Sequence, residues 1–168
     1  NAGTIIRKTN RLLETSDTAR RYSTLIERGE ATSRCDLSAV VTDAVAEVGE
    51  AYPEVTIDVD APGSCPVVTG TGIRDVLTGL VENAAKHNNS PDPRVRVRLR
   101  TRDRPTLTIE DNGPGIPKHD LRAFKAGHES PLTHSSGVGV WLSKWVIEGA
   151  GGDLSFDTGP EGTRVTIE

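Results

Sequence analysis

The fold is indicated first by residues 94–117, RVRVRLRTRDRPTLTIEDNGPGIP. Arginine occupies every second position from 94 to 104, and Val95, Val97 and Leu99 fill places between. Successive side chains of a strand point to opposite faces of its sheet. This stretch therefore predicts a strand with one buried apolar face and one charged outer face.

After the arginine-rich segment, Pro105 begins a second alternating segment in which Leu107 and Ile109 are the inward pair. The two segments predict a β-hairpin. The arginines either contact nucleic acid or form a solvated outer face. The chain has 20 Lys and Arg against 24 Asp and Glu, a net charge of −4, and the arginines have no interleaved aromatics. These features favour the solvated face and no nucleic-acid partner.

Periodicity predicts the other elements around this hairpin. Asp36 is placed to cap a helix running to about residue 50. Alternation at Val55, Ile57 and Val59 predicts a strand, followed by a short apolar piece at 67–68 and a helix at about 72–88. A further helix ends at Gly149, and two strands near 153–157 and 163–168 meet across Gly159 and Pro160. The expected apolar stripe of the helix that ends at Gly149 consists of Val138, Trp141, Leu142, Trp145 and Val146.

Residues 4–31 contain apolar side chains at intervals of seven, at Ile5, Leu12, Ala19 and Ile26. This spacing predicts a long amphipathic helix. It either packs on its own domain or forms half of a helical hairpin that pairs with another chain.

Together, the predicted strands and helices lead us to expect an α/β fold, specifically an α+β two-layer sandwich. Its mixed, mostly antiparallel sheet carries helices on one face and follows a long N-terminal helix.

The helix at 72–88 divides into two faces on a helical wheel. The apolar stripe consists of Ile73, Leu77, Leu80, Val81 and Ala84. The opposite side carries a candidate site, made of Gly79, Glu82, Asn83, Lys86 and His87. A carboxylate can orient or deprotonate a nucleophile, an amide oxygen can bind Mg²⁺, and an ammonium group can contact phosphate.

A second candidate site is DNGPG, which directly follows the inward-facing pair of the second hairpin strand. Asp111 at a strand end requires a hydrogen-bond donor if it is partly buried. The amino group of adenine is such a donor, whereas guanine presents a carbonyl oxygen there. Gly113 and Gly115 would let the backbone approach a flat ring. Residues 135–140, SSGVGV, open a helix and suit phosphate binding or simple capping.

Taken in order, three segments resemble the boxes of the ATP-binding catalytic domain of two-component sensor histidine kinases, in the superfamily shared with gyrase, Hsp90 and MutL. LTGLVENAAKH at 77–87 is similar to the N box, EDNGPGIP at 110–117 to the first glycine box, and HSSGVGVWLSKWVIEGAGGDLSF at 134–156 to the second. Gly162 and Thr163 resemble the third glycine box, and Phe124 the F box within the lid.

The resemblance implies a role for each matching residue. Asn83 would hold Mg²⁺, Lys86 would contact phosphate, and Glu82 would be the catalytic carboxylate. Asp111 would bind the adenine amino group. The remaining nucleotide-binding positions would be His87, Gly113, Gly115, Ile116, Gly137, Val138, Gly139, Val140 and Thr163.

The resemblance also implies that the chain is divided into two segments. Residues 34–168 would be the ATP-binding catalytic domain. Residues 1–33 would be the second helix of a dimerisation and phosphotransfer hairpin with its linker, through which a homodimer forms. The expected activity is transfer of the γ-phosphoryl group of ATP to a histidine outside these 168 residues, because His87, His119, His128 and His134 all lie in the nucleotide-binding region.

The implied partners are the helix that bears the acceptor histidine, upstream or on another chain, and a response regulator. The expected location is the cytoplasm. Two alternatives remain open: a serine kinase of the anti-sigma-factor type, and a non-catalytic ATP-binding or dimerisation module. Ser135, in place of a glycine of the second box, favours the latter.

Overall fold

A computed structural model describes residues 32–116 and 143–168. These residues form two helices, seven strands and a further helical stretch at 143–149. The helices are α2 (Leu37–Ala51) and α3 (Ile73–Lys86). The strands are β1 (Thr32–Asp36), β2 (Thr56–Asp60), β3 (Pro66–Gly70), β4 (Arg94–Thr101), β5 (Pro105–Asp111), β6 (Leu154–Gly159) and β7 (Gly162–Ile167).

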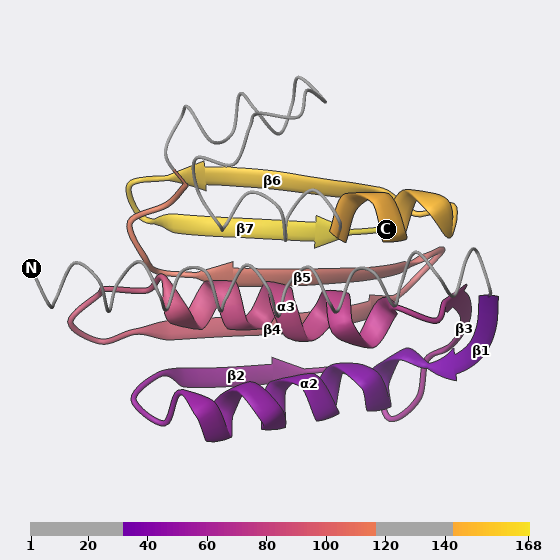
Figure 1. The fold of residues 1–168 in the computed structure, drawn as a ribbon, viewed down its shortest axis with the longest axis horizontal. Helices are drawn as coiled ribbons and strands as arrows, with labels where there is room; N and C mark the ends of the chain where they lie inside the picture. Colours follow the sequence, from indigo (N-terminus) through magenta and orange to yellow (C-terminus); the bar gives the residue numbers. More distant parts are fainter. Residues whose placement is uncertain (1–31, 117–142) are drawn as a thin grey trace, which may run out of the picture.

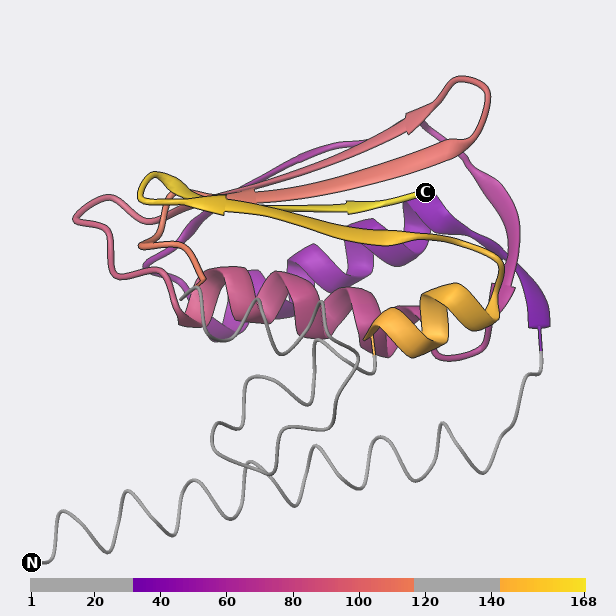
Figure 2. The ribbon, with the colours of Figure 1, turned by 90° about the horizontal axis from the view of Figure 1, so that it is seen from above.

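Five of the strands form one sheet in the order β2-β4-β5-β7-β6. The β2–β4 pair is parallel and the other three pairs are antiparallel. Figure 1 shows the strands of this sheet one above another, and Figure 2 shows α2, α3 and the 143–149 helix together on one of its faces. The predicted two-layer fold with a mixed, mostly antiparallel sheet is confirmed.

The hairpin at 94–111 has the predicted alternation. Val95, Val97 and Leu99 are at most 1% exposed, and Leu107 and Ile109 are at most 2% exposed. These side chains form the core together with the buried faces of α2 and α3. Burial of large aliphatic side chains contributes about 1.5–3 kcal/mol each, so this alternation helps to hold β4 and β5 against the helices.

The outer face of the sheet carries charges that alternate across the strands. In the register, Arg96 lies opposite both Asp58 of β2 and Glu110 of β5, and Arg164 of β7 lies opposite both Glu110 and Asp157 of β6. Glu110 accepts from Arg164 Nε at 2.6 Å. The arginine stripe is thus part of a face with oppositely charged neighbours.

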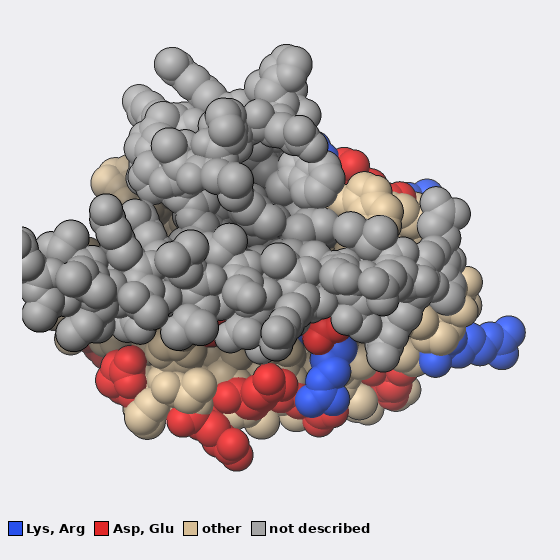
Figure 3. Space-filling view, in the orientation of Figure 1, with Lys and Arg blue, Asp and Glu red and all other residues tan. Residues whose placement is uncertain are grey.

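Helix α2 begins as expected, because the Asp36 carboxylate accepts from the Ser38 amide at 3.0 Å. The expected helix at 72–88 is confirmed as α3, whose buried residues include Leu77, Leu80 and Val81. Arg74 of α3 lies 3.5 Å from Asp43 and 3.6 Å from Glu47 of α2. Acidic side chains gather over α2 in Figure 3.

Two features differ from the expectations. Strand β1 was not expected, and it pairs with β3 as a separate two-stranded sheet. The placement of Trp145 on an apolar stripe is wrong, because Trp145 is 44% exposed while Ile147 is 3% exposed. Ser143 and Ile147 are one helical turn apart and mark the buried side of this helix, and Trp145, midway between them, points away.

Several predictions lie outside the described residues. These concern the helix at 4–31, the lid with Phe124, and Gly137, Val138, Gly139 and Val140 of the second glycine box. Within the described parts of the chain, no helix has the length and apolar character needed to cross a membrane.

Candidate functional site

The site is organised around Asp111, the last residue of β5, the central strand of the sheet. Its backbone pairs with Val95 of β4 on one side and Thr163 of β7 on the other. One carboxylate oxygen, Oδ1, accepts from the Gly113 amide at 2.9 Å and from the Thr163 amide at 3.3 Å. Among residues 32–116 and 143–168, no hydrogen bond to Oδ2 is found. One oxygen is therefore held by the protein, and the other has no donor among the described residues.

Burial raises the pKa of the Asp111 carboxyl above its ordinary value. The two amide hydrogen bonds, from Gly113 and Thr163, and the nearby His87 act in the opposite direction but do not cancel this effect. A half-buried carboxylate lacks part of its hydration, so a ligand N–H group that reaches Oδ2 would replace the missing water.

The glycines around Asp111 are required by close approach of protein backbone. A Cβ on Gly162, whose φ is +132°, would lie 1.9 Å from the Asp111 carbonyl oxygen. A Cβ on Gly115, whose φ is +77°, would lie 2.2 Å from the Gly159 carbonyl oxygen, and one on Gly113 would lie 3.0 Å from Asp111 Oδ1. Protein atoms thus closely approach the positions of the missing side chains at Gly113 and Gly115. That these two glycines also let the backbone approach a flat ring stays a prediction.

A pair of threonines connects the β6–β7 hairpin to the segment after β5. The Thr158 hydroxyl accepts from the Ile116 amide at 2.7 Å, and its oxygen lies 3.2 Å from that of Thr163. Thr163 is 7% exposed. Thr158 was missed from the sequence because a hydroxyl at the end of a strand has no distinctive pattern.

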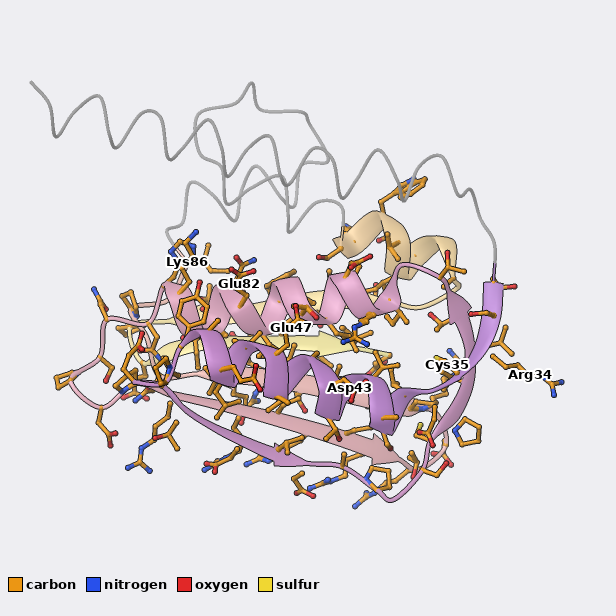
Figure 4. The ribbon with its side chains drawn as sticks, turned by 60° about the horizontal axis from the view of Figure 1, so that its bottom comes forward. Arg34, Cys35, Asp43, Glu47, Glu82 and Lys86 are labelled. Carbon is orange, nitrogen blue, oxygen red and sulfur yellow. The ribbon has the colours of Figure 1, made fainter. Side chains whose placement is uncertain are left out.

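The C-terminal half of α3 contributes the remaining described candidates. Glu82 and Asn83 are half-buried, whereas Lys86 and His87 are exposed. Figure 4 shows Glu82 and Lys86 near the C-terminal end of α3. Glu82 Oε1 accepts from the Tyr52 hydroxyl, just beyond α2, at 3.2 Å. Glu82 thus lies on the side of α3 nearest α2, and Tyr52 is a second residue that sequence patterns did not reveal.

The end of α3 and the segment after β5 are adjacent. The Cα atom of Asn88 lies 3.4 Å from the position of a Cβ on Gly113. The structure therefore brings together His87, Asp111, Gly113, Gly115, Ile116 and Thr163. No group of three or more His, Cys, Asp or Glu side chains able to hold a metal is found in the described part of the chain. A cation here would need an amide oxygen such as that of Asn83, together with oxygens of the ligand.

Comparison with known proteins gives a consistent result. A family described as "Histidine kinase-, DNA gyrase B-, and HSP90-like ATPase" matches residues 69–168. The chain is 30% identical to the sensor protein ChvG of Agrobacterium fabrum over 166 residues, 89% of this chain and 28% of ChvG. It is 30% identical to the probable sensor histidine kinase TcrY of Mycobacterium tuberculosis over 153 residues, 84% of this chain and 31% of TcrY. The chain thus spans less than a third of these relatives.

Among solved structures, the mycobacterial sensor histidine kinase MprB is similar with a TM-score of 0.67 and 27% identity, covering 82% of this chain and 95% of that one. The full-length structure of ShkA in complex with AMPPNP has a TM-score of 0.72 at 17% identity, which shows a shared fold, over 98% of this chain and 37% of that one. The chain belongs to the family of histidine kinase-, DNA gyrase B- and HSP90-like ATPases.

Proposed function

We propose that residues 34–168 are the ATP-binding catalytic domain of a two-component sensor histidine kinase. The domain transfers the γ-phosphoryl group of ATP to a histidine outside these 168 residues. The observation that carries the proposal is the half-buried Asp111 carboxylate, with Oδ1 held by two backbone amides and Oδ2 without a partner among the described residues. The sequence relatives ChvG and TcrY, named as a sensor protein and a probable sensor histidine kinase, support it.

Asp111 gives the site its preference for adenine. An ionised carboxylate only accepts hydrogen bonds, so Oδ2 binds the exocyclic amino group of adenine and repels the carbonyl oxygen that guanine has at that place. Gly113, Gly115, Ile116, Thr163 and His87, which lie near Asp111, would surround the base. The site fits an adenine nucleotide because it offers a fixed hydrogen-bond acceptor at the end of a buried strand.

The phosphates would lie toward the C-terminal end of α3. The side-chain oxygen of Asn83 would hold Mg²⁺, and Lys86 would contact the phosphates. Gly137 and Gly139 would support the phosphate lid, and Val138 and Val140 would be further nucleotide-binding positions. A bound Mg²⁺ ion neutralises phosphate charge in such sites. Glu82, with one oxygen held by Tyr52, is the carboxylate that orients the acceptor imidazole or accepts its proton.

In the transfer, an imidazole nitrogen of the acceptor forms a bond to the γ-phosphorus while the bond from that phosphorus to the bridging oxygen breaks, and ADP leaves. The acceptor histidine lies on a helix upstream in the parent chain or on a partner chain, and a response regulator receives the phosphoryl group afterwards. Residues 1–33 would be the second helix of a dimerisation hairpin with its linker and mediate a homodimer. This domain acts in the cytoplasm.

The test combines nucleotide titration with phosphoryl transfer to a supplied hairpin that carries a histidine. With Mg²⁺, Asn83→Ala should weaken ATP binding about 10-fold and abolish transfer, because a metal ligand is lost. Without metal its affinity should stay within about twofold of the original. The control is Asn89→Ala, which changes an exposed asparagine just beyond α3.

Three results would count against the proposal. Equal loss of affinity with and without Mg²⁺ would show that Asn83 does not act through the metal. ATP binding without any transfer to the hairpin would instead support the non-catalytic module. Absence of ATP binding to the unmodified chain would overturn the assignment as a whole.

A further inference from the structure

Two asparagines connect the segment after β5 to the connection between α3 and β4. Asn112 Oδ1 accepts from the Arg94 amide at 2.8 Å and from Asn88 Nδ2 at 2.9 Å. Asn112 Nδ2 donates to the Asp92 carbonyl at 2.9 Å and to Ser90 Oγ at 3.3 Å. A carboxamide has two acceptor positions and two N–H donors. All four positions of this surface side chain are therefore occupied by protein groups.

Asn88 holds the opposite side of this junction. Its Nδ2 also donates to the Arg94 carbonyl at 3.2 Å, and its Oδ1 accepts from the Ser90 amide at 3.2 Å. Asn88 is itself attached to α3, because its amide donates to the Ala85 carbonyl at 3.2 Å. The asparagine junction, Asn88 with Asn112, thus joins the C-terminal end of α3 to the end of β5.

The junction acts on Asp111 through one peptide group. Asn112 is the residue between Asp111 and Gly113, and the Gly113 amide is the closer of the two donors to Asp111 Oδ1, at 2.9 Å against 3.3 Å from Thr163. Anchoring the Asn112 side chain fixes the residue that precedes this amide. The Gly113 amide then holds Oδ1, which leaves Oδ2 directed to the ligand.

We propose that Asn112 and Asn88 are positioning residues for adenine recognition. They contact protein rather than nucleotide, and they set the orientation of the Asp111 carboxylate relative to the end of α3, where Asn83, Lys86 and His87 lie. This inference rests on the proposed function, because it assumes that Asp111 binds adenine. It adds a requirement that the base-binding and phosphate-binding parts of the site be held in one relative position.

The test measures ATP and GTP affinity in Asn112→Ala, Asn88→Ala and the double variant. Asn112→Ala should weaken ATP binding about 10-fold and Asn88→Ala about threefold, since loss of one to several hydrogen bonds in a positioning network has effects of this order. The double variant should be about as weak as Asn112→Ala alone, because the two side chains act through a shared hydrogen bond.

Purine selectivity separates positioning from general stability. Asn112→Ala should reduce the preference for ATP over GTP, because a displaced carboxylate no longer favours the adenine amino group. The control is Val48→Ala, which truncates a side chain that is 3% exposed in α2. It should lower the melting temperature without changing either affinity or selectivity. All titrations are made well below the melting temperature of the weakest variant.

The outcomes are distinguishable. Unchanged ATP affinity and selectivity in folded Asn112→Ala, alongside weakened binding in Asp111→Asn, would overturn the role of the junction and leave the proposed function intact. If Asn112→Ala does not fold, Asn88→Ala decides in the same way, because it removes only part of the network. No ATP binding to the unmodified chain would overturn both the function and this inference.

Discussion

Asp36 ends β1 and Asp111 ends β5, and the two differ in how the protein uses their carboxylate oxygens. Asp36 Oδ1 accepts from the amides of Ser38 and Cys65 at 3.0 and 2.9 Å, and Oδ2 accepts from the Ser64 hydroxyl at 2.6 Å. Asp111 has donors on Oδ1 alone among the described residues. A carboxylate whose two oxygens both have protein donors holds the fold together, whereas one with an available oxygen is suited to hold a ligand.

The pKa values of the two carboxyls are shifted in opposite directions, as their hydrogen bonds would suggest. The hydrogen bond from Ser64, followed by that from the Cys65 amide, lowers the pKa of Asp36 below its ordinary value. Burial raises the pKa of Asp111. Hydrogen bonds to the charged form favour ionisation and burial opposes it. The fold therefore stabilises the charge of Asp36, whereas the hydrogen bonds to Asp111 do not fully offset the effect of its burial.

The largest expected effect is on nucleotide binding at Asp111. Asp111→Asn should weaken ATP binding about 50-fold, because a hydrogen bond to an ionised acceptor contributes about 1.5–3 kcal/mol. Calorimetric titration measures this, with Asp103→Asn in the exposed β4–β5 loop as the control. Unchanged ATP affinity would show that Asp111 does not bind the nucleotide.

The next effect is on stability at Asp36. Asp36→Ala should lower the melting temperature by about 5 °C, because the substitution removes the N-cap of α2 and the contacts to the segment before β3. Thermal unfolding followed by circular dichroism checks it. ATP affinity measured below the transition should be unchanged. A loss of affinity without a loss of stability would reverse the roles assigned to the two aspartates.

The pH dependence of stability should have opposite signs at the two sites. The stabilisation from ionised Asp36 is present above its ordinary pKa of 3.8 and is lost as the pH falls through its lower folded value. Asp36→Asn should therefore be less stable at pH 7, with a gap that closes in acid. For Asp111, stability is favoured below pH 3.8 and is lost as the pH rises through the raised folded pKa.

Asp111→Asn should accordingly raise the melting temperature by about 2 °C at pH 7, and this gain should disappear toward pH 3.5. Denaturation curves of both asparagine variants at several pH values provide the measurement. If both asparagine variants were less stable than the unmodified chain at pH 7, or both more stable, the opposite pKa shifts of Asp36 and Asp111 would be contradicted.

The smallest effect comes from one hydroxyl. Ser64→Ala should lower the melting temperature by about 2 °C and move the pKa of Asp36 back toward its ordinary value, because it removes a single hydrogen bond to Oδ2. Carboxyl NMR titration of Asp36 checks the second part. An unmoved Asp36 pKa would show that the backbone amides alone account for its acidity.

Local patterns allowed much of the fold to be predicted. The alternation at 95–99 and 107–109 identified the central hairpin, and Asp36 before an apolar helical repeat identified the start of α2. Both signals are expressed within a few consecutive residues. Asp111 was found in the same way, since an acidic residue directly follows the inward-facing side chains of a strand.

Other features depend on residues far apart in the chain and left no local signal. Strand β1, TSRCD, has little apolar character and exists because it pairs with β3 about thirty residues later. Tyr52 reaches Glu82 across 30 positions, and Gly115 is required by the Gly159 carbonyl of another hairpin. Tertiary packing decides these contacts. Local patterns therefore predicted most elements of the fold, but not the long-range contacts that hold them together.

The alternating charges on the outer face of the sheet have a consequence for behaviour at high concentration. Asp58, Arg96, Glu110, Arg164 and Asp157 follow one another across neighbouring strands. Two copies stacking through this face would have to dehydrate the whole row, at a cost that mutual attraction of the charges does not recover. The charged row thus disfavours stacking of two copies through this face of the sheet.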